Sequence, residues 1–131
     1  MNVGDKTEVK YQVQSSDLAK TLSLDPQDDF PEVFATSRMV ALMELAAARL
    51  MKPLLSDGEL SVGVNVNVNH LAATPINAKV RAVATFLGME GKLYKFSVAL
   101  FDPAGEAGNG THTRAVVKTE RLVSGAAKRA E

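Results

Sequence analysis

The sequence contains no cysteine, and only 5% of its 131 residues are aromatic. Without cysteine there is no disulfide bond, no thiolate nucleophile and no cysteine-ligated zinc site. The sequence also has no run of about 18 uncharged apolar residues, and the N-terminal segment MNVGDKTEVK lacks the apolar stretch of a signal peptide. We therefore expect a soluble, cytoplasmic protein with no membrane partner.

An excess of charge of either sign is missing as well. Fifteen Lys and Arg residues balance 15 Asp and Glu residues. A chain without net charge has no overall field to attract a polyanion, so we expect no nucleic-acid partner. The length, together with 46% hydrophobic residues, is typical of one globular domain with a modest core.

One long helix stands out between residues 36 and 52, TSRMVALMELAAARLMK. The segment is rich in Ala, Leu and Met, contains no Gly or Pro, and is followed by Pro53, so it favours a helix capped by Thr36 or Ser37. The preceding segment 24–35 carries two prolines and four acidic residues, which indicates a loop. Two phenylalanines lie on this loop, Phe30 and Phe34. They fit two roles equally well: the loop could be a flap over an apolar site, or the two rings could anchor the loop to the core.

Alternation of apolar and polar residues predicts five strands. The turn sequences GMEG and DPAG separate the later ones, and the predicted strands are 7–13, 60–70, 78–89, 92–101 and 110–123. A strand, a long helix and four strands in a meander predict an α+β fold in which a mainly antiparallel five-stranded sheet wraps one central helix. We expect a single domain over residues 1–122, a disordered tail over 123–131, and pairing of open sheet edges in a homodimer.

The stretch SVGVNVNVNH, residues 61–70, ends on one of only two histidines. Strand residues two apart share a face, so strict alternation places His70 with Val62 to Val68, opposite Gly63 and the asparagines, and toward the helix. Glu44 occupies an apolar stripe of that helix, where a carboxylate is rarely buried without a partner. We therefore expect Glu44 and His70 to face each other as an acid/base pair; the alternatives are a core histidine and an ion pair of Glu44 with an arginine.

Thr36 lies eight residues before Glu44, at the start of the predicted helix. Its hydroxyl fits a capping role, or a hydrogen bond to a substrate beside the free backbone N–H groups of the first turn. In the last strand, His112 and Arg114 share a face with Val116, which would place a charged residue toward the core.

Motifs of several other enzyme classes are missing, including GxSxG, the Walker glycine loop and HExxH. Two histidines among scattered acidic residues make no convincing metal site. We therefore expect neither a metal nor a cofactor.

The segments FPEVFATSRMVALMELA, HLAATP and GTHTRAVV, in this order, resemble the fluoroacetyl-CoA thioesterase group of the hot-dog fold superfamily over residues 30–117. The resemblance implies a hot-dog fold and a catalytic set of Thr36, Glu44 and His70. It also implies that Gly63 and Arg114 contact the acyl end of the substrate.

In that group two phenylalanines, three residues apart, cover the acyl pocket. Phe30 matches the second position and is a candidate substrate-binding residue, whereas Gln27 occupies the first. The resemblance thus implies hydrolysis of a short acyl-CoA thioester and leaves the acyl group open.

The resemblance further implies a homodimer with active sites at the subunit interface, in which the strand after the helix pairs with its mate. Higher oligomers are left open. Two other functions stay open beside the thioesterase: a non-catalytic acyl-thioester binding protein and, less favoured, an enoyl-CoA hydratase.

Overall fold

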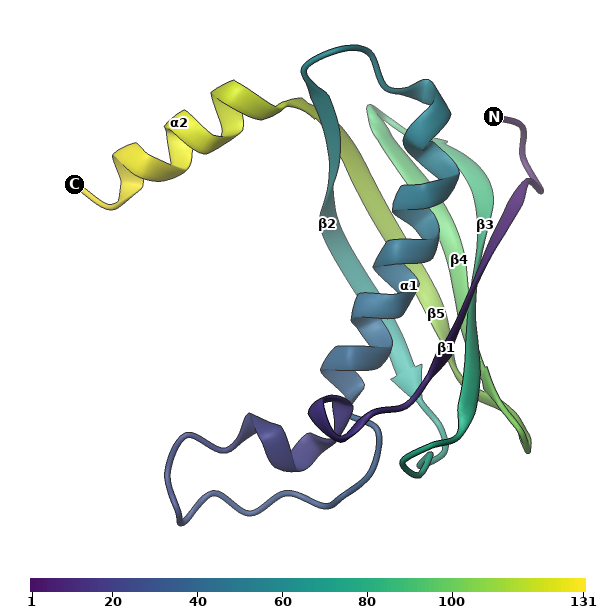
Figure 1. The fold of residues 1–131 in the computed structure, drawn as a ribbon. Coiled ribbons are helices and arrows are strands. Elements are labelled where there is room, and N and C mark those ends of the chain that lie inside the picture. Colours follow the sequence, from purple (N-terminus) through teal and green to yellow (C-terminus); the bar gives the residue numbers. More distant parts are fainter.

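Five antiparallel strands form one sheet that curves around a long helix, α1, in a computed structural model of residues 1–131 (Figure 1). The α+β prediction is therefore confirmed. Helix α1 is Thr36–Met51, and the strands are β1 Lys6–Gln12, β2 Glu59–His70, β3 Lys79–Glu90, β4 Leu93–Asp102 and β5 Gly105–Lys118. Short 3₁₀ turns cover Ser15–Asp17, Ala19–Leu22 and Lys52–Leu54.

The strand order is β1-β3-β4-β5-β2, so the predicted four-strand meander is only partly present. Strands β3, β4 and β5 are neighbours in turn, but β2 pairs with β5 instead of β3. The connection between β2 and β3, residues 71–78, is too long for a tight hairpin and carries the chain from one side of the sheet to the other. As a result, β2 is an edge strand with one unpaired side.

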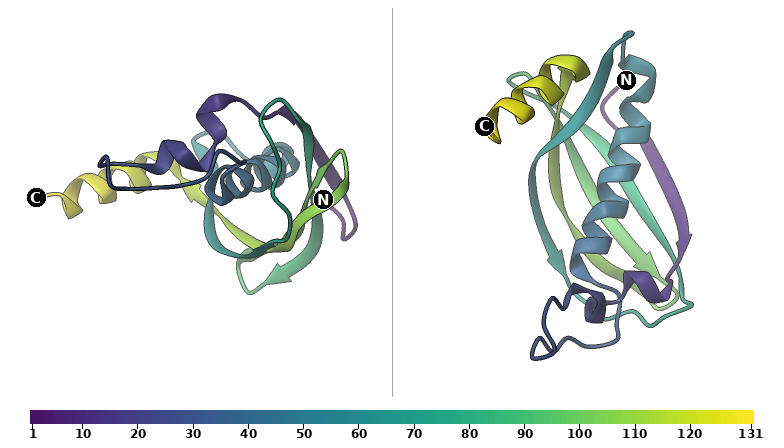
Figure 2. Two further views of the ribbon diagram at one scale, coloured as in Figure 1. Left: turned by 90° about the horizontal axis from the view of Figure 1, so that it is seen from below. Right: turned by 60° about the vertical axis from the view of Figure 1, so that its left-hand side comes forward.

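The core lies between α1 and the concave side of the sheet (Figure 2). Small residues at the contact, Ala46 and Ala47 on the helix and Ala82 and Ala84 on β3, are fully buried and allow the helix to approach the sheet closely. Three helix methionines, Met39, Met43 and Met51, fill the remaining space beside Phe86, Phe96 and Leu100.

A β-bulge in β2 changes the predicted faces of this strand. The pairing of β2 with β5 shifts between Gly63 and Asn65, which leaves Val64 as the extra residue. Gly63 is opposite Arg114 and Val66 is opposite His112, and both partners are buried in the core. Val66, Val68 and His70 therefore face α1 as predicted, whereas the predicted faces of Val62 and Gly63 were wrong, because alternation cannot continue through an inserted residue.

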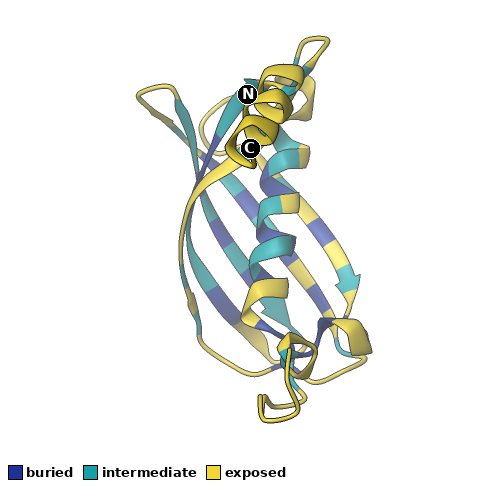
Figure 3. Cartoon of the chain, turned by 90° about the vertical axis from the view of Figure 1, so that its left-hand side faces the viewer, coloured by how far each residue is buried: buried dark blue, intermediate teal, exposed yellow.

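The C-terminal residues differ from the prediction too. Strand β5 ends at Lys118, and in place of the disordered tail predicted for residues 123–131 the chain forms helix α2, Thr119–Arg129. Good helix formers such as Arg121, Leu122, Ala126 and Ala127 outweigh the single Gly125. Helix α2 buries none of its residues, as Figure 3 shows. Neither helix is long and apolar enough to cross a membrane.

Candidate active site

Thr36 and His70 meet where α1 begins and β2 ends. Ala35, in extended conformation, is the N-cap of α1, and Thr36 is the first helical residue. The prediction that Thr36 or Ser37 caps the helix was therefore wrong. The Thr36 hydroxyl is therefore free of a capping role. Its Oγ1 atom lies 2.8 Å from Nδ1 of His70 and forms a hydrogen bond with it.

The other ring nitrogen of His70, Nε2, is buried and has no hydrogen-bond partner in the chain. A buried polar atom without a partner is costly, and such atoms occur where a ligand or a reacting group is to be met. Thr36 and His70 also line a mainly apolar hollow of about 320 Å³. Its other walls come from the loop before α1 and the segment after β2, among them Pro31, Val33 and Leu71.

Asp17 fixes the start of α1. Its buried carboxylate accepts hydrogen bonds from the Tyr11 hydroxyl at 2.6 Å, the Gln14 amide at 2.7 Å and Nε of Arg38 at 2.9 Å, while its backbone carbonyl accepts from the Ala35 amide at 2.9 Å. Burial alone would raise the pKa of Asp17, but these hydrogen bonds outweigh burial and lower it. The carboxylate thus stays charged and holds the helix end that carries Thr36.

Two turns further along α1, Glu44 pairs with Arg114 of β5. Arg114 NH1 donates to Oε1 of Glu44 at 3.2 Å, and its other guanidinium nitrogens donate to Oγ and to the carbonyl of Ser61, each at 3.0 Å. Burial lowers the pKa of Arg114, and the Glu44 carboxylate acts in the opposite direction. The guanidinium therefore has fixed partners on α1 and β2, as a buried charge requires.

His112 lies beside this pair and has a defined proton position. Arg114 NH1 is only a donor, so Nε2 of His112, 3.2 Å away, accepts. Nδ1 then carries the proton and donates to the Asn65 carbonyl at 2.7 Å, next to the bulge in β2. Burial lowers the pKa of His112, and the nearby Arg114 charge lowers it further, against the Asn65 hydrogen bond and the Glu44 charge, which raise it.

Gly63 is required by the position of Glu44. A methyl group at residue 63 would overlap Oε1 of Glu44 and would lie 3.3 Å from Cε1 of His112. Only glycine lets β2 pass this close to the carboxylate. Thus Gly63, Arg114 and Glu44, which the family resemblance assigns to one substrate site, lie together in the structure.

The expected contact between Glu44 and His70 is not formed within one chain. Eight helical residues separate Thr36 from Glu44, or about 12 Å along the axis, and each residue has another partner: His70 bonds to Thr36, and Glu44 to Arg114. The ion pair of Glu44 with an arginine, left open from the sequence, is therefore what the chain contains.

The two loop phenylalanines have different surroundings. Phe34 is a buried core anchor, whereas Phe30 is exposed and does not line the hollow at Thr36. Sequence reasoning missed Asp17 and Ser61. The only signal for Ser61 was its spacing of two residues from Gly63 on the same strand.

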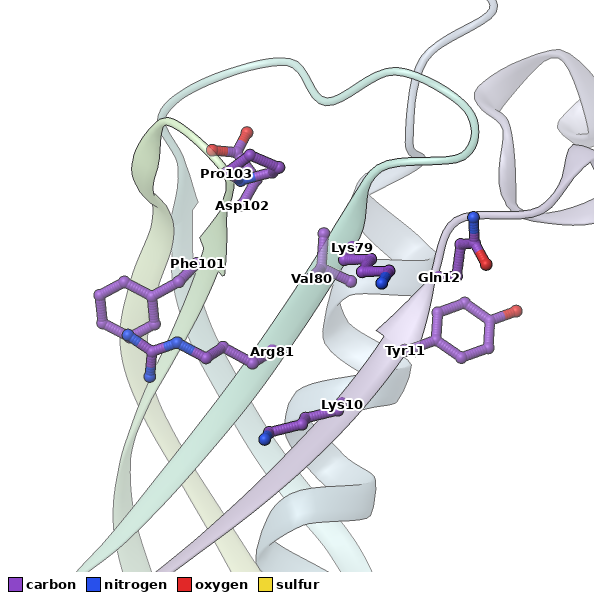
Figure 4. Close-up of a pocket in the computed structure, with 9 residues that line it drawn as sticks. All are labelled: Lys10, Tyr11, Gln12, Lys79, Val80, Arg81, Phe101, Asp102 and Pro103. Carbon is purple, nitrogen blue, oxygen red and sulfur yellow. The ribbon is translucent and has the colours of Figure 1, made fainter.

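A larger hollow, of about 580 Å³, lies at β1, β3 and β4 and is not lined by Thr36, Glu44 or His70 (Figure 4). It is lined by Lys10, Arg81 and Phe101 among others, and the Arg81 guanidinium lies 4.1 Å from the centre of the Phe101 ring. This hollow holds no set of residues suited to acyl transfer, so the candidate site is the smaller one. No three His, Asp or Glu side chains are grouped so that they could hold a metal ion.

The chain is similar in sequence to known thioesterases. Residues 13–120 match the family described as fluoroacetyl-CoA-specific thioesterase. A fluoroacetyl-CoA thioesterase of Streptantibioticus cattleyicolor is 45% identical over 94 residues, which are 72% of this chain and 68% of the relative. The chain belongs to this family.

Solved structures agree with membership of the fluoroacetyl-CoA-specific thioesterase family. The thioesterase FlK is 37% identical and superposes with a TM-score of 0.92, covering 98% of this chain and 96% of FlK. A single-residue variant of FlK, solved with fluoroacetate and CoA, is 38% identical with a TM-score of 0.88, covering 93% and 99% of the two chains. A Thermus thermophilus thioesterase superfamily member, 23% identical and with a TM-score of 0.87, covers 98% and 93% and shares the fold. The predicted hot-dog fold is thus confirmed.

Proposed function

We propose that this protein hydrolyses the thioester bond of a short acyl-CoA with Thr36, Glu44 and His70. Membership of the thioesterase family supports the reaction. The observation that carries the proposal is the 2.8 Å hydrogen bond between Thr36 and His70 at the start of α1, beside an apolar hollow. A hydroxyl, an imidazole and a helix N-terminus are the groups that acyl transfer uses.

The thioester carbonyl would lie at the N-terminus of α1. The first amides of a helix have no intrahelical partner, and they favour negative charge as it develops on the carbonyl oxygen. The Thr36 hydroxyl would add a donor there. By family resemblance, Phe30, Gly63 and Arg114 would contact the acyl end.

A complete site needs a carboxylate, and we propose that it comes from a second copy of the chain. Strand β2 has an unpaired edge of 12 residues and exposed valines, with Val64 at 54% exposure. Such an edge is a template for another strand. If two β2 strands pair antiparallel about an axis near Asn65, residue 63 of one copy lies opposite residue 67 of the other.

That pairing brings the two halves of the site together. Gly63 touches Glu44, and residue 67 is three residues from His70. Each Thr36–His70 pair would thus face Glu44 of the partner subunit. The homodimer would have two equal sites at its interface. The asparagines of β2 would lie near the two-fold axis of this dimer.

The reaction in this site is a hydrolysis. A C–O bond forms from water to the carbonyl carbon, the C–S bond breaks, and the leaving thiolate takes a proton. Glu44 would either take the proton from the attacking water or attack the carbonyl carbon itself, which gives an anhydride that water then hydrolyses; Nε2 of His70 would give a proton to the leaving sulfur. Water is the only co-reactant, so we propose no cofactor, and we propose a cytoplasmic location.

Release of free thiol tests the function. Acetyl-, fluoroacetyl-, propionyl- and butyryl-CoA would be incubated with the protein and with the variant Glu44→Gln, and free CoA would be titrated with a thiol reagent. We expect hydrolysis of at least one short acyl-CoA and a loss of about 100-fold or more in kcat for the variant. Binding of acyl-CoA without thiol release would favour the binding protein, and near-normal turnover of Glu44→Gln would remove Glu44 from the mechanism.

A further inference from the structure

Helix α2 has an apolar side that nothing in the chain covers. At 100° per residue, Leu122, Val123, Ala126 and Ala127 lie on one side of this helix. Leu122 is 45% exposed and Val123 is 61% exposed. The helix leaves the sheet and projects past β2, as Figures 1 and 2 show. An apolar side held out in this way marks an interaction surface.

The loop before α1 projects on the same side of β2, at the opposite end of the strand (Figures 1 and 2). Leu24 in this loop is 97% exposed, and Leu71, just after β2, is 58% exposed. The loop also carries four acidic residues between positions 25 and 32, whereas α2 carries three basic residues and one acidic residue. The two projections are thus complementary in charge, and both expose leucines.

Symmetry brings these two projections together between copies. Lys118, the last residue before α2, pairs with Glu59 at the start of β2, and His70 at the end of β2 contacts Thr36. In the antiparallel pairing of two β2 strands about Asn65, residue 59 of one copy lies opposite residue 71 of the other. The start of α2 in one subunit therefore lies two strand spacings, about 10 Å, from Leu71 of the partner subunit, and α2 projects past β2 toward it.

We infer that α2 of one subunit packs over the Thr36–His70 hollow of the partner subunit and forms a wall of that active site. Leu122 and Val123 would cover Leu71 and Leu24, and the net positive charge of α2 would lie near the acidic loop, although Arg121 and Lys128 are on the other side of the helix. The inference rests on the dimer and the function proposed above. It explains why Thr36 is solvent-exposed in the single chain, since the covering element belongs to the other subunit.

A wall of this kind has two effects on the reaction. It closes the open side of the hollow, which excludes water other than the attacking one and strengthens polar interactions inside. It also places side chains of a second subunit against the substrate, so that α2 contributes to KM and to acyl preference without supplying a reacting group.

Cross-linking tests the packing independently of activity, and the absence of native cysteine makes it clean. The double variant Leu71→Cys/Leu122→Cys would be oxidised mildly and run on a non-reducing gel. Within one chain the two residues lie at opposite ends of a strand about 40 Å long, so no intramolecular bond can form. We expect a covalent dimer. The matched control Leu71→Cys/Ser124→Cys, on the other side of α2, should stay monomeric on the gel.

Kinetics separates this inference from the proposed function. We expect Leu122→Asp to lower kcat/KM about 10-fold, mainly through KM, while Ser124→Asp stays within about twofold of the unmodified protein. If the protein is an active dimer but neither the cross-link nor the Leu122→Asp effect appears, the inference is wrong and the function stands. If the cross-link forms but no acyl-CoA is hydrolysed, the docking of α2 stands and the proposed function fails.

Discussion

The Oγ1 atom of Thr36 lies 2.8 Å from Nδ1 of His70, which joins the first residue of α1 to the last residue of β2. Each residue is placed by its own element, and neither is part of the hydrophobic core. The contact therefore depends on how Asp17 and the residues around it hold the helix end. It also leaves Nε2 of His70 buried without a hydrogen-bond partner in the chain.

Removal of the Thr36 hydroxyl should affect catalysis more than stability. Thr36→Val keeps the shape of the side chain but deprives His70 of its partner, and we expect kcat/KM to fall about 10- to 1,000-fold. Because Thr36 is not the helix cap, the free energy of unfolding should change by less than about 1 kcal/mol. Steady-state kinetics and urea denaturation measure the two effects. Thr36→Ser, which keeps a hydroxyl, should retain most activity; equal losses in both variants would contradict the account.

Gly63→Ala should disturb Glu44. The added methyl group would overlap the Glu44 carboxylate, so either the side chain or β2 must move. We expect a loss of about 1–3 kcal/mol in stability and at least a 10-fold loss in kcat. Gly125→Ala is a matched control, since no atom lies within 4 Å of the added methyl group. An unchanged kcat in Gly63→Ala would show that the position of Glu44 is not critical.

Stability should depend on pH through His112. Its folded pKa lies below the ordinary value of 6.5, so between these two values the unfolded chain binds more protons than the folded chain. The contribution of neutral His112 is fully present above pH 6.5. It is lost progressively as the pH falls from 6.5 toward the lowered pKa, where Arg114 would meet a protonated ring.

The measurement is urea denaturation between pH 8 and pH 5. The variant His112→Asn keeps a donor for the Asn65 carbonyl but does not titrate, so its free energy of unfolding should fall less over this range. The difference between the two curves isolates His112 from the other titrating groups. Parallel curves would mean that His112 does not control stability here.

Much of the fold follows from local sequence patterns. The helix was predicted at residues 36–52 because this segment is rich in helix-forming apolar residues and contains no Gly or Pro. In the structure it is Thr36–Met51. Strand alternation located all five strands. It did not reveal the bulge at Val64, because a bulge depends on what the partner strand must accommodate, here Arg114 and His112 beside Glu44.

The candidate site was only partly predictable. Spacing placed His70 on the helix-facing side, and the structure agrees. Spacing could not show that His70 meets Thr36, two helical turns before Glu44, since that depends on how β2 runs along α1. The order of the strands could not be predicted either. The connection of eight residues after β2 is long enough for β2 to pair with β3 or with β5.

Gln27→Phe should alter acyl selectivity. By family resemblance this position carries the first of two lid phenylalanines, and Phe30 is present but exposed. A second aromatic side chain would add apolar contact area over the acyl group. We expect the ratio of kcat/KM for fluoroacetyl-CoA to that for acetyl-CoA to rise several-fold. Gln27→Leu, apolar but not aromatic, serves as the control, and an unchanged ratio in Gln27→Phe would exclude an aromatic lid in this chain.

The most direct test of the proposed site is complementation between two inactive variants, His70→Ala and Glu44→Gln. If Glu44 acts on the Thr36–His70 pair of the partner subunit, a mixed dimer has one site with both lesions and one intact site. Co-refolding the variants in equal amounts should therefore restore about a quarter of the thioesterase activity of the unmodified protein. If mixed dimers form, as judged by two purification tags, but activity stays at the sum of the two variants, Glu44 does not act across the interface.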